Sequence, residues 1–274
     1  MNKLIVPMLI ASLLLGACSH LPQRTAPAAP ASPSVSSAAT AESPAPNDNL
    51  NAVAWTQAAI ERDLIYRQTY RDAGQQLSRA LADPAWDALP AEDRKSPLVA
   101  GLKPAVIVDI DETVLDNSPY QARLVVNNAS YDEFTWAQWC REERAHAVPG
   151  VVEFLREQAT LANLRKLDLP IANDEQAFLG LGTVVPGCEQ HGSEKGCRRQ
   201  LIAQKYRVLV QVGDQLGDFV DVTANTPQGR RDAVEPYLDW IGERWFVLPN
   251  PTYGSWEPAL FNNDWRQPAQ DRRR

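Results

Sequence analysis

Residues 109–118 read DIDETVLDNS and follow the apolar run AVIV at residues 105–108. A short apolar run that stops at acidic residues is typical of a buried β-strand. The D-x-D-x-T order places the carboxylates of Asp109 and Asp111 just beyond the carboxyl end of that strand. Open α/β folds form their sites at this edge of the sheet. The stretch therefore predicts an α/β fold with a site around these two acids.

A second apolar run, at residues 206–212, continues into the sequence GDQLGD at residues 213–218. If the two strands are neighbours in a parallel sheet, four carboxylates meet in a small volume: Asp109, Asp111, Asp214 and Asp218. Like charges at that separation repel one another unless a cation lies among them. A half-open cluster of oxygen ligands suits magnesium, which keeps several waters. We therefore predict a Mg²⁺ site.

These motifs, with two flanking stretches, resemble the class C bacterial acid phosphatases of the haloacid-dehalogenase superfamily. That family includes the outer-membrane lipoprotein 5'-nucleotidases. The matching stretches are DIDETVLDNSPY at 109–120, AVPG at 147–150, GDQLGDF at 213–219 and LPNPTYGSWE at 248–257. The resemblance implies a Rossmann-like parallel sheet with a small helical cap, which we place at about 117–145.

The resemblance also assigns chemical roles. Asp109 corresponds to the nucleophile, which forms an aspartyl-phosphate, and a carboxylate can attack without a base because it is already ionised. Asp111 corresponds to the acid that protonates the leaving oxygen and then activates water. Asp109, the Asp111 carbonyl and Asp214 correspond to magnesium ligands, with Asp218 in the outer shell.

Three further residues match the substrate-binding positions of the family. Lys195 falls where a lysine faces the phosphate, and a fixed cation there stabilises the charge on the phosphoryl oxygens. Trp136 and Tyr253 match the aromatic pair that stacks on the base or nicotinamide ring of a nucleotide. The residues alone leave other interpretations open. Lys195 can be a solvated lysine at a helix start, and Trp136 can be a core residue.

The chain departs from the family between the AVPG stretch and residue 160. The relatives have an apolar strand there that ends in T-N-R or S-N-R, and its hydroxyl binds the transferring phosphoryl group. Here residues 148–159 run directly into residues 160–167. Roughly twenty residues are absent, enough for one strand of about 5–6 residues and its loops. Thr160 corresponds to the start of the following helix, so it does not replace the missing hydroxyl.

The absent strand would pair with the strand before Asp109, so the sheet is expected to be one central strand short. Buried backbone groups rarely stay unpaired. Either residues 177–181 move across to pair, the Asp109 strand lies at an edge, or the fold is compromised. The segments on either side should merge, because apolar residues recur at nearly helical spacing from 151 to 164. This spacing predicts one continuous helix over most of residues 151–167.

The rest of the chain gives a coarse order of elements. A long helix is expected over about 50–82, ended by Asp83 and Pro84. Further strands are expected near 177–181, 207–212 and 245–248, with a helix near 231–240 between the last two. Together with the strand before Asp109, these elements fit one domain at 49–274.

The first residues predict export. Lys3 precedes an apolar run at 4–15 that is too short for a usual membrane span. The last residue of the run begins the sequence LGAC at 15–18. Residues 1–18 therefore resemble a lipoprotein signal peptide, with Cys18 as the acylated residue. Ser19 after that cysteine favours the outer membrane in Gram-negative sorting. Residues 19–48, rich in Ala, Pro and Ser, indicate a flexible tether.

An exported chain can hold disulfides. Cys188 and Cys197 flank a turn-rich segment and are the natural pair, and Cys140 is then expected to be free and buried. The net charge is −7, and no long basic stripe runs through the sequence. Binding of a nucleic-acid polymer is therefore not expected.

The sequence thus predicts a Mg²⁺-dependent acid phosphatase that acts on nucleoside monophosphates, nicotinamide mononucleotide or similar small phosphomonoesters. We expect its turnover to be impaired by the missing strand. The alternative is a non-catalytic surface lipoprotein that keeps the metal site and the aromatic pocket. The oligomeric state is left open, with a homodimer as one alternative.

Overall fold

Three parallel strands form the central sheet of the computed structural model, which describes residues 46–94, 99–157, 163–164, 169–170, 179–181, 183–189 and 194–272. The strands are β1 (Lys103–Val108), β6 (Tyr206–Gly213) and β7 (Trp245–Val247), in the order β1-β6-β7. β6 is buried along nearly its whole length, as expected of a central strand that is apolar on both faces. The α/β fold predicted from the motifs is confirmed.

β1 lies at the edge of this sheet among the described residues. It pairs only with β6, from Lys103 opposite Tyr206 to Val108 opposite Val212, and it is only partly buried. This is the position expected if the strand that should flank β1 is missing. The predicted substitute at 177–181 is not seen in its described part, because Leu179–Leu181 form no strand. Residues 177–178 lie outside the described residues.

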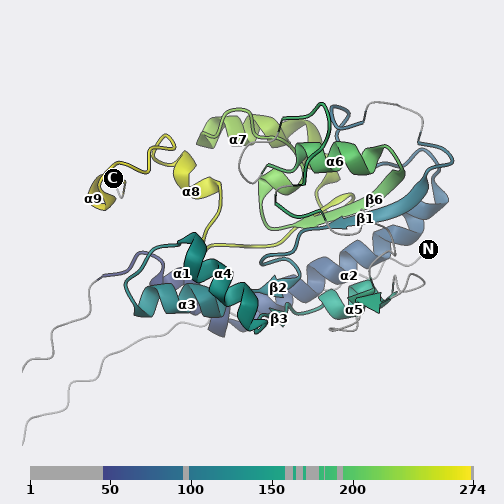
Figure 1. Ribbon diagram of the computed structural model, residues 1–274. Coiled ribbons are helices and arrows are strands. Elements are labelled where there is room, and N and C mark those ends of the chain that lie inside the picture. Colours follow the sequence, from purple (N-terminus) through teal and green to yellow (C-terminus); the bar gives the residue numbers. More distant parts are fainter. Residues whose placement is uncertain are drawn as a thin grey trace, which may run out of the picture. The chain divides into compact units, whose positions relative to one another are not determined.

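Helices cover both faces of the sheet (Figure 1). α2 (Ile60–Ala82) and α5 (Val151–Glu157) lie on one face, and α6 (Gly196–Ala203) and α7 (Pro227–Val234) lie on the other. The buried side of α2 repeats every three or four residues, which is the pattern of an amphipathic helix: Tyr66, Tyr70, Ala73, Leu77 and Ala80. α2 therefore forms the floor of one core.

The single helix expected over 50–82 is two helices. α1 (Leu50–Ala58) ends before Ala59, whose backbone is extended with φ −80° and ψ 119°, and α2 begins at Ile60. The expected end before Pro84 is correct. Between β6 and β7, the helix expected over 231–240 begins earlier, at Pro227. It changes to a 3-10 helix, η2 (Glu235–Trp240), where Pro236 removes a backbone donor.

The continuous helix predicted over most of residues 151–167 is wrong. α5 ends at Glu157, and a short strand, β4 (Asn163–Leu164), pairs antiparallel with β5 (Leu169–Pro170). Helical spacing is a weak guide where tertiary contacts compete with it. Leu169 also precedes a proline, which pushes it to extended backbone and provides a partner for β4. Residues 158–162 and 165–168 lie outside the described residues.

The cap predicted at 117–145 corresponds to two helices. α3 (Ser118–Val126) and α4 (Glu133–Glu142) lie between β2 (Leu115–Asp116) and β3 (His146–Ala147), which pair with each other. Two further short helices, α8 (Trp256–Ala259) and α9 (Ala269–Arg272), follow β7. No helix in the described part of the chain is both long enough and apolar enough to span a membrane.

Candidate active site

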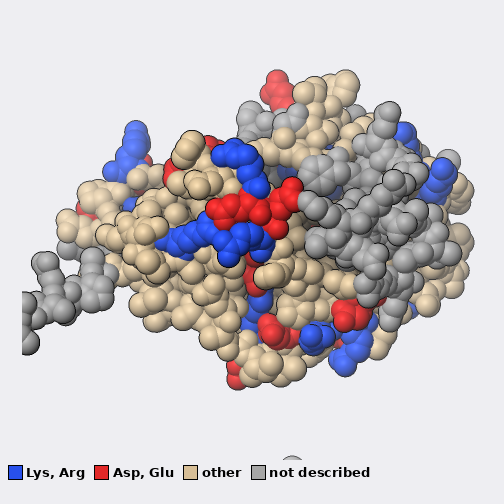
Figure 2. Space-filling view, turned by 60° about the horizontal axis from the view of Figure 1, so that its bottom comes forward, with Lys and Arg blue, Asp and Glu red and all other residues tan. Residues whose placement is uncertain are grey.

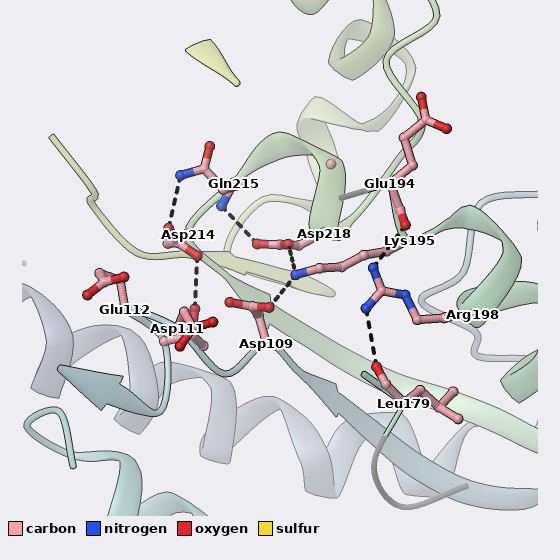
Figure 3. Close-up of polar contacts among 12 residues, drawn as sticks. Asp109, Asp111, Glu112, Leu179, Glu194, Lys195, Arg198, Asp214, Gln215 and Asp218 are labelled. Carbon is pink, nitrogen blue, oxygen red and sulfur yellow. Dashed lines mark hydrogen bonds and ion pairs between the residues drawn. The ribbon is translucent and has the colours of Figure 1, made fainter. Parts of the chain in front are cut away.

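The acidic residues predicted from the two motifs meet where β1 and β6 end. Asp109 follows β1 directly, and its N–H donates to the Val212 carbonyl over 3.0 Å. Asp214 follows β6, and Asp218 closes the short 3-10 helix η1 (Leu216–Asp218). One carboxylate oxygen from each of these three aspartates lies within 4.8 Å of the others. Figure 3 shows the three side chains converging.

Gly213 makes this close approach possible. A Cβ at that position would lie 2.2 Å from Asp218 Oδ2, so any other residue would force the carboxylate away. Asp218 Oδ2 instead accepts the Gln215 backbone N–H over 2.8 Å. The G-D-x-x-x-D motif therefore folds into a tight turn that aims both of its acids at Asp109.

Lys195 lies between two of the acids (Figure 3). Its Nζ donates to Asp109 Oδ1 and to Asp218 Oδ1. Burial disfavours the charged amine, but Asp218 and Asp109 outweigh this effect and raise the lysine pKa. Lys195 is the N-cap of α6, as its glycine-flanked sequence predicts, and it remains a cation at neutral pH.

The cluster carries more negative charge than one lysine can offset. Burial, then the neighbouring acids, raise the pKa of Asp218 to about 6 and that of Asp214 well above its usual range. The three aspartates supply hard oxygen ligands of the kind that Mg²⁺ prefers. The donor set and its excess charge therefore fit a divalent cation held by Asp109, Asp214 and Asp218.

Asp214 is held by neutral donors. Its Oδ2 accepts from Asn250 Nδ2 over 2.8 Å and from Gln215 Nε2 over 2.9 Å, and its Oδ1 lies 3.3 Å from Thr113 Oγ1. Amide and hydroxyl donors orient a carboxylate. Burial and the neighbouring acids raise the pKa of Asp214, and the smaller effect of the Asn250 and Gln215 donors lowers it.

Asp111 lies beside the three-carboxylate cluster, and its side chain is not part of it (Figure 3). Asp111 Oδ1 accepts from Asn117 Nδ2 over 2.9 Å. Burial, with Asp109 next, raises the pKa of its carboxyl. A carboxyl of raised pKa two residues beyond the candidate nucleophile is suited to donating a proton.

Two tyrosines of α2 hold the backbone of the turn after Asp111 in place. Tyr66 Oη donates to the Glu112 carbonyl over 2.7 Å, and Tyr70 Oη donates to the Thr113 carbonyl over 2.5 Å. Both tyrosines are 1% exposed, so water does not compete for these bonds. The long helix thus fixes the turn that carries Asp111.

Sequence reasoning missed the role of Glu112. It adopts a left-handed backbone with φ 58°, and its buried side chain accepts the Asn117 backbone N–H over 2.8 Å and the Tyr253 hydroxyl. Burial raises its pKa to about 8, although both hydrogen bonds lower it. Its place inside D-x-D-E-T was visible, but its partner Tyr253 is 141 residues away and gave no signal.

Tyr253 and Trp136, the predicted aromatic pair, are positioned by separate groups. Trp136 packs edge-on against Tyr120, with ring centroids 5.2 Å apart, and it also contacts Tyr131. Among the ring contacts of the described residues, none joins Trp136 to Tyr253. The structure therefore gives Trp136 an aromatic cluster on the cap, whereas Tyr253 reaches the site through Glu112.

Arg199 is a second residue that sequence reasoning missed. Its guanidinium pairs with Asp93 at 2.5 Å and Asp221 at 2.7 Å, and it donates to the Gly217 carbonyl over 2.9 Å. Arg199 and Asp93 are almost fully buried. Because Arg199 follows Lys195 by one helical turn, this network ties α6 to the turn that carries Asp218.

Cys188 and Cys197 are joined by a disulfide with Cα atoms 5.7 Å apart. Cys197 lies in the first turn of α6, so the bridge fixes the segment that presents Lys195. Closing so short a loop stabilises the fold by about 2–3 kcal/mol in the chain-entropy description. Cys140 is free, as expected, but it is exposed, not buried. α4 turns Trp139 to the interior, and the next residue along a helix points elsewhere.

Cys18, the predicted lipidation site, lies outside the described residues. The structure therefore brings together Asp109, Asp111, Asp214, Asp218 and Lys195, which are the residues of the predicted catalytic centre.

The comparisons with known proteins agree with this geometry. The model of the family "HAD superfamily, subfamily IIIB (Acid phosphatase)" matches residues 28–162 and 156–256. The class C acid phosphatase from Bacillus anthracis with tungstate bound is 27% identical with a TM-score of 0.64. A second structure of that enzyme is 28% identical with a TM-score of 0.63. Each alignment covers 82% of this chain and 93% of the relative.

The family match is divided into two segments that meet at residues 156–162. That is where the sequence is expected to lack the strand ending in T-N-R. Both halves of the site, the D-x-D-x-T segment and the G-D-x-x-x-D segment, lie within the matched residues. With this coverage and the convergent acids at the ends of β1 and β6, the chain belongs to the acid phosphatases of HAD subfamily IIIB.

Proposed function

We propose that this chain is a Mg²⁺-dependent acid phosphatase that removes phosphate from nucleoside monophosphates or similar small phosphomonoesters. The observation that carries the proposal is the convergence of Asp109, Asp214, Asp218 and Lys195 at the carboxyl edge of the sheet, with Asp111 beside them. A bound magnesium ion would offset the charge that gathers on the phosphoryl oxygens.

In the proposed reaction Asp109 attacks phosphorus and forms an aspartyl-phosphate, while the ester bond to the leaving oxygen breaks. Asp111 gives its proton to that oxygen, then removes a proton from the water that hydrolyses the intermediate. Lys195 contacts the phosphoryl oxygens, and this contact replaces its present ion pair with Asp109. In the structure Lys195 already contacts the Asp109 carboxylate.

The substrate is expected to be small. Trp136 and Tyr253 are the candidates for stacking on a base, worth about 1–3 kcal/mol per base. On the face shown in Figure 2, a group of basic side chains lies directly beside a group of acidic ones. In the cap, for example, Arg123 pairs with Glu142. These charges support a nucleotide monomer rather than a polymer.

We also propose that turnover is impaired. The edge position of β1 and the division of the family match at residues 156–162 support this view. The same observations favour a second candidate, a non-catalytic lipoprotein that binds nucleotide and metal without turnover. The two candidates share the site and differ only in whether phosphate is released.

A single-turnover assay with a nucleoside monophosphate separates the two. With Mg²⁺ present we expect slow phosphate release that EDTA stops and added Mg²⁺ restores, because three carboxylates beside the phosphate need a counter-cation. Calorimetry of the same samples measures binding. Tight binding with no released phosphate would support the non-catalytic candidate, and release that is unaffected by EDTA would contradict the metal requirement.

We further propose that the protein is anchored to the outer membrane through acylated Cys18, on the strength of the L-G-A-C sequence. Labelling with palmitate in a bacterial host should mark the intact chain and should be lost in Cys18→Ser. Cys140→Ser is the control, because this cysteine is exposed and free. Label that persists in Cys18→Ser would remove the anchor from this position.

A further inference from the structure

The cap is connected to Asp111 by two hydrogen bonds in series. Trp139, on α4, donates its indole Nε1–H to Asn117 Oδ1 over 2.8 Å. Asn117 Nδ2 in turn donates to Asp111 Oδ1 over 2.9 Å. Trp139 is 3% exposed and Asn117 is 2% exposed, so water does not compete for the hydrogen bond between them.

The chemistry of the indole fixes the direction of this chain. An indole N–H can only donate, whereas an amide has one acceptor oxygen and one donor NH₂ group. Asn117 must therefore turn Oδ1 toward Trp139, which leaves Nδ2 for Asp111. The reversed amide would place two donors against each other. Asp111 Oδ1 consequently always meets a donor.

The first two members of this hydrogen-bond chain, Trp139 and Asn117, are held in place by other contacts. The backbone N–H of Asn117 donates to Glu112 Oε1 over 2.8 Å. The Arg123 guanidinium lies 5.0 Å from the centre of the Trp139 ring and pairs through both of its terminal nitrogens with Glu142. Trp139 and Asn117 therefore have little freedom to leave this arrangement.

We propose that Trp139 and Asn117 are positioning residues that hold the transferable proton of Asp111 on Oδ2 by keeping Oδ1 engaged as an acceptor. The inference rests on the proposed phosphatase function, since it concerns the acid of that reaction. The cap would then contribute to catalysis, because Trp139 of α4 determines which carboxyl oxygen of Asp111 carries the proton for the leaving group.

Comparing substrates with poor and good leaving groups tests this positioning role. A poor leaving group needs the proton of Asp111 as the ester bond breaks, whereas a good leaving group departs without it. Phenyl phosphate and 4-nitrophenyl phosphate have nearly the same shape but differ in this respect. A residue that positions the acid should therefore affect the phenyl ester far more than the nitrophenyl ester.

The variant Trp139→Phe keeps the ring and loses the N–H. We expect kcat/KM for phenyl phosphate to fall about tenfold, the usual worth of one buried hydrogen bond, and that for 4-nitrophenyl phosphate to change by less than about twofold. Asn117→Leu, which removes both bonds, should show at least as large a difference between the two esters.

Trp86→Phe is the matched control. Trp86 is equally buried, and its indole donates to the Leu209 carbonyl over 2.7 Å, away from the acids. This variant should lower Tm and leave the ratio of the two rate constants unchanged. If Trp139→Phe lowers both rate constants equally, or neither, the positioning role is overturned.

A chain that hydrolyses neither ester would count against the proposed function and would leave the hydrogen-bond chain open to a second measurement. In ¹⁵N-labelled protein, the side-chain amide resonance of Asn117 should move in Trp139→Phe and in Asp111→Asn, and stay in place in Trp86→Phe. An Asn117 resonance that is unchanged in the first two variants would overturn the inference without reference to activity.

Discussion

Replacing Asp109 by Asn should abolish phosphate release while the protein stays folded and binds nucleotide. An amide is not a nucleophile toward phosphorus, and losing the attacking group of a covalent mechanism typically lowers the rate on the order of 10³–10⁶-fold. Asp109 is also one of three acids that repel one another, so removing its charge relieves the cluster. The ion pair with Lys195 is lost at the same time, but Asp218 still pairs with that lysine, so Tm should change little.

Single-turnover assays, calorimetry and thermal unfolding of the same preparation check this result. Asp264→Asn is the control, because it makes the same chemical change at an exposed ion pair with Arg266. Phosphate release by Asp109→Asn at the rate of the unchanged chain would remove Asp109 from the role of nucleophile. Loss of nucleotide binding would instead show that the Asp109 carboxylate is needed to bind the nucleotide before the reaction.

The sequence was sufficient to place the acidic centre because the relevant signals are local. Each motif follows an apolar run, and parallel strands present their carboxyl ends at one edge. Those two facts bring Asp109 and Asp214 together without knowledge of any other contact. Lys195 required the family resemblance, since the residues alone left open a solvated lysine at a helix start.

The supporting residues could not be found in this way. Glu112 and Tyr253 are 141 residues apart, and Arg199 and Asp93 are 106 residues apart. No spacing or composition connects such pairs, because the contacts exist only after the sheet and its helices have packed. They are nevertheless the contacts that hold the turn of Asp111 and the turn of Asp218.

The segment after α5 shows the opposite failure. Its apolar residues have helical spacing, yet Asn163–Leu164 form part of a small antiparallel pair. A periodic pattern states which side of a helix could be buried, and it does not state whether a surface exists to bury it.

Restoring the absent strand should raise phosphatase activity by about 10²–10³-fold. The change is an insertion between residues 159 and 160 of an apolar strand ending in T-N-R, with its loops. β1 pairs only with β6 among the described residues, so its other edge is the position that the inserted strand would occupy. The threonine hydroxyl would then face the phosphoryl group from the side opposite Lys195. Removal of one such preorganised donor typically costs about 10²–10³ in rate.

A second insertion distinguishes the effect of the threonine hydroxyl on the rate from the effect of the restored strand. The same segment ending in A-N-R should pair with β1 and raise Tm to a similar extent, but without the hydroxyl it should recover little of the rate. Steady-state kinetics with 4-nitrophenyl phosphate and Mg²⁺, measured beside the Bacillus anthracis enzyme, provide the scale. If the chain as it stands already matches that enzyme, the strand is dispensable, and the proposed impairment is wrong. If both insertions raise the rate equally, the defect lies in the open edge of β1 and not in a missing phosphate ligand.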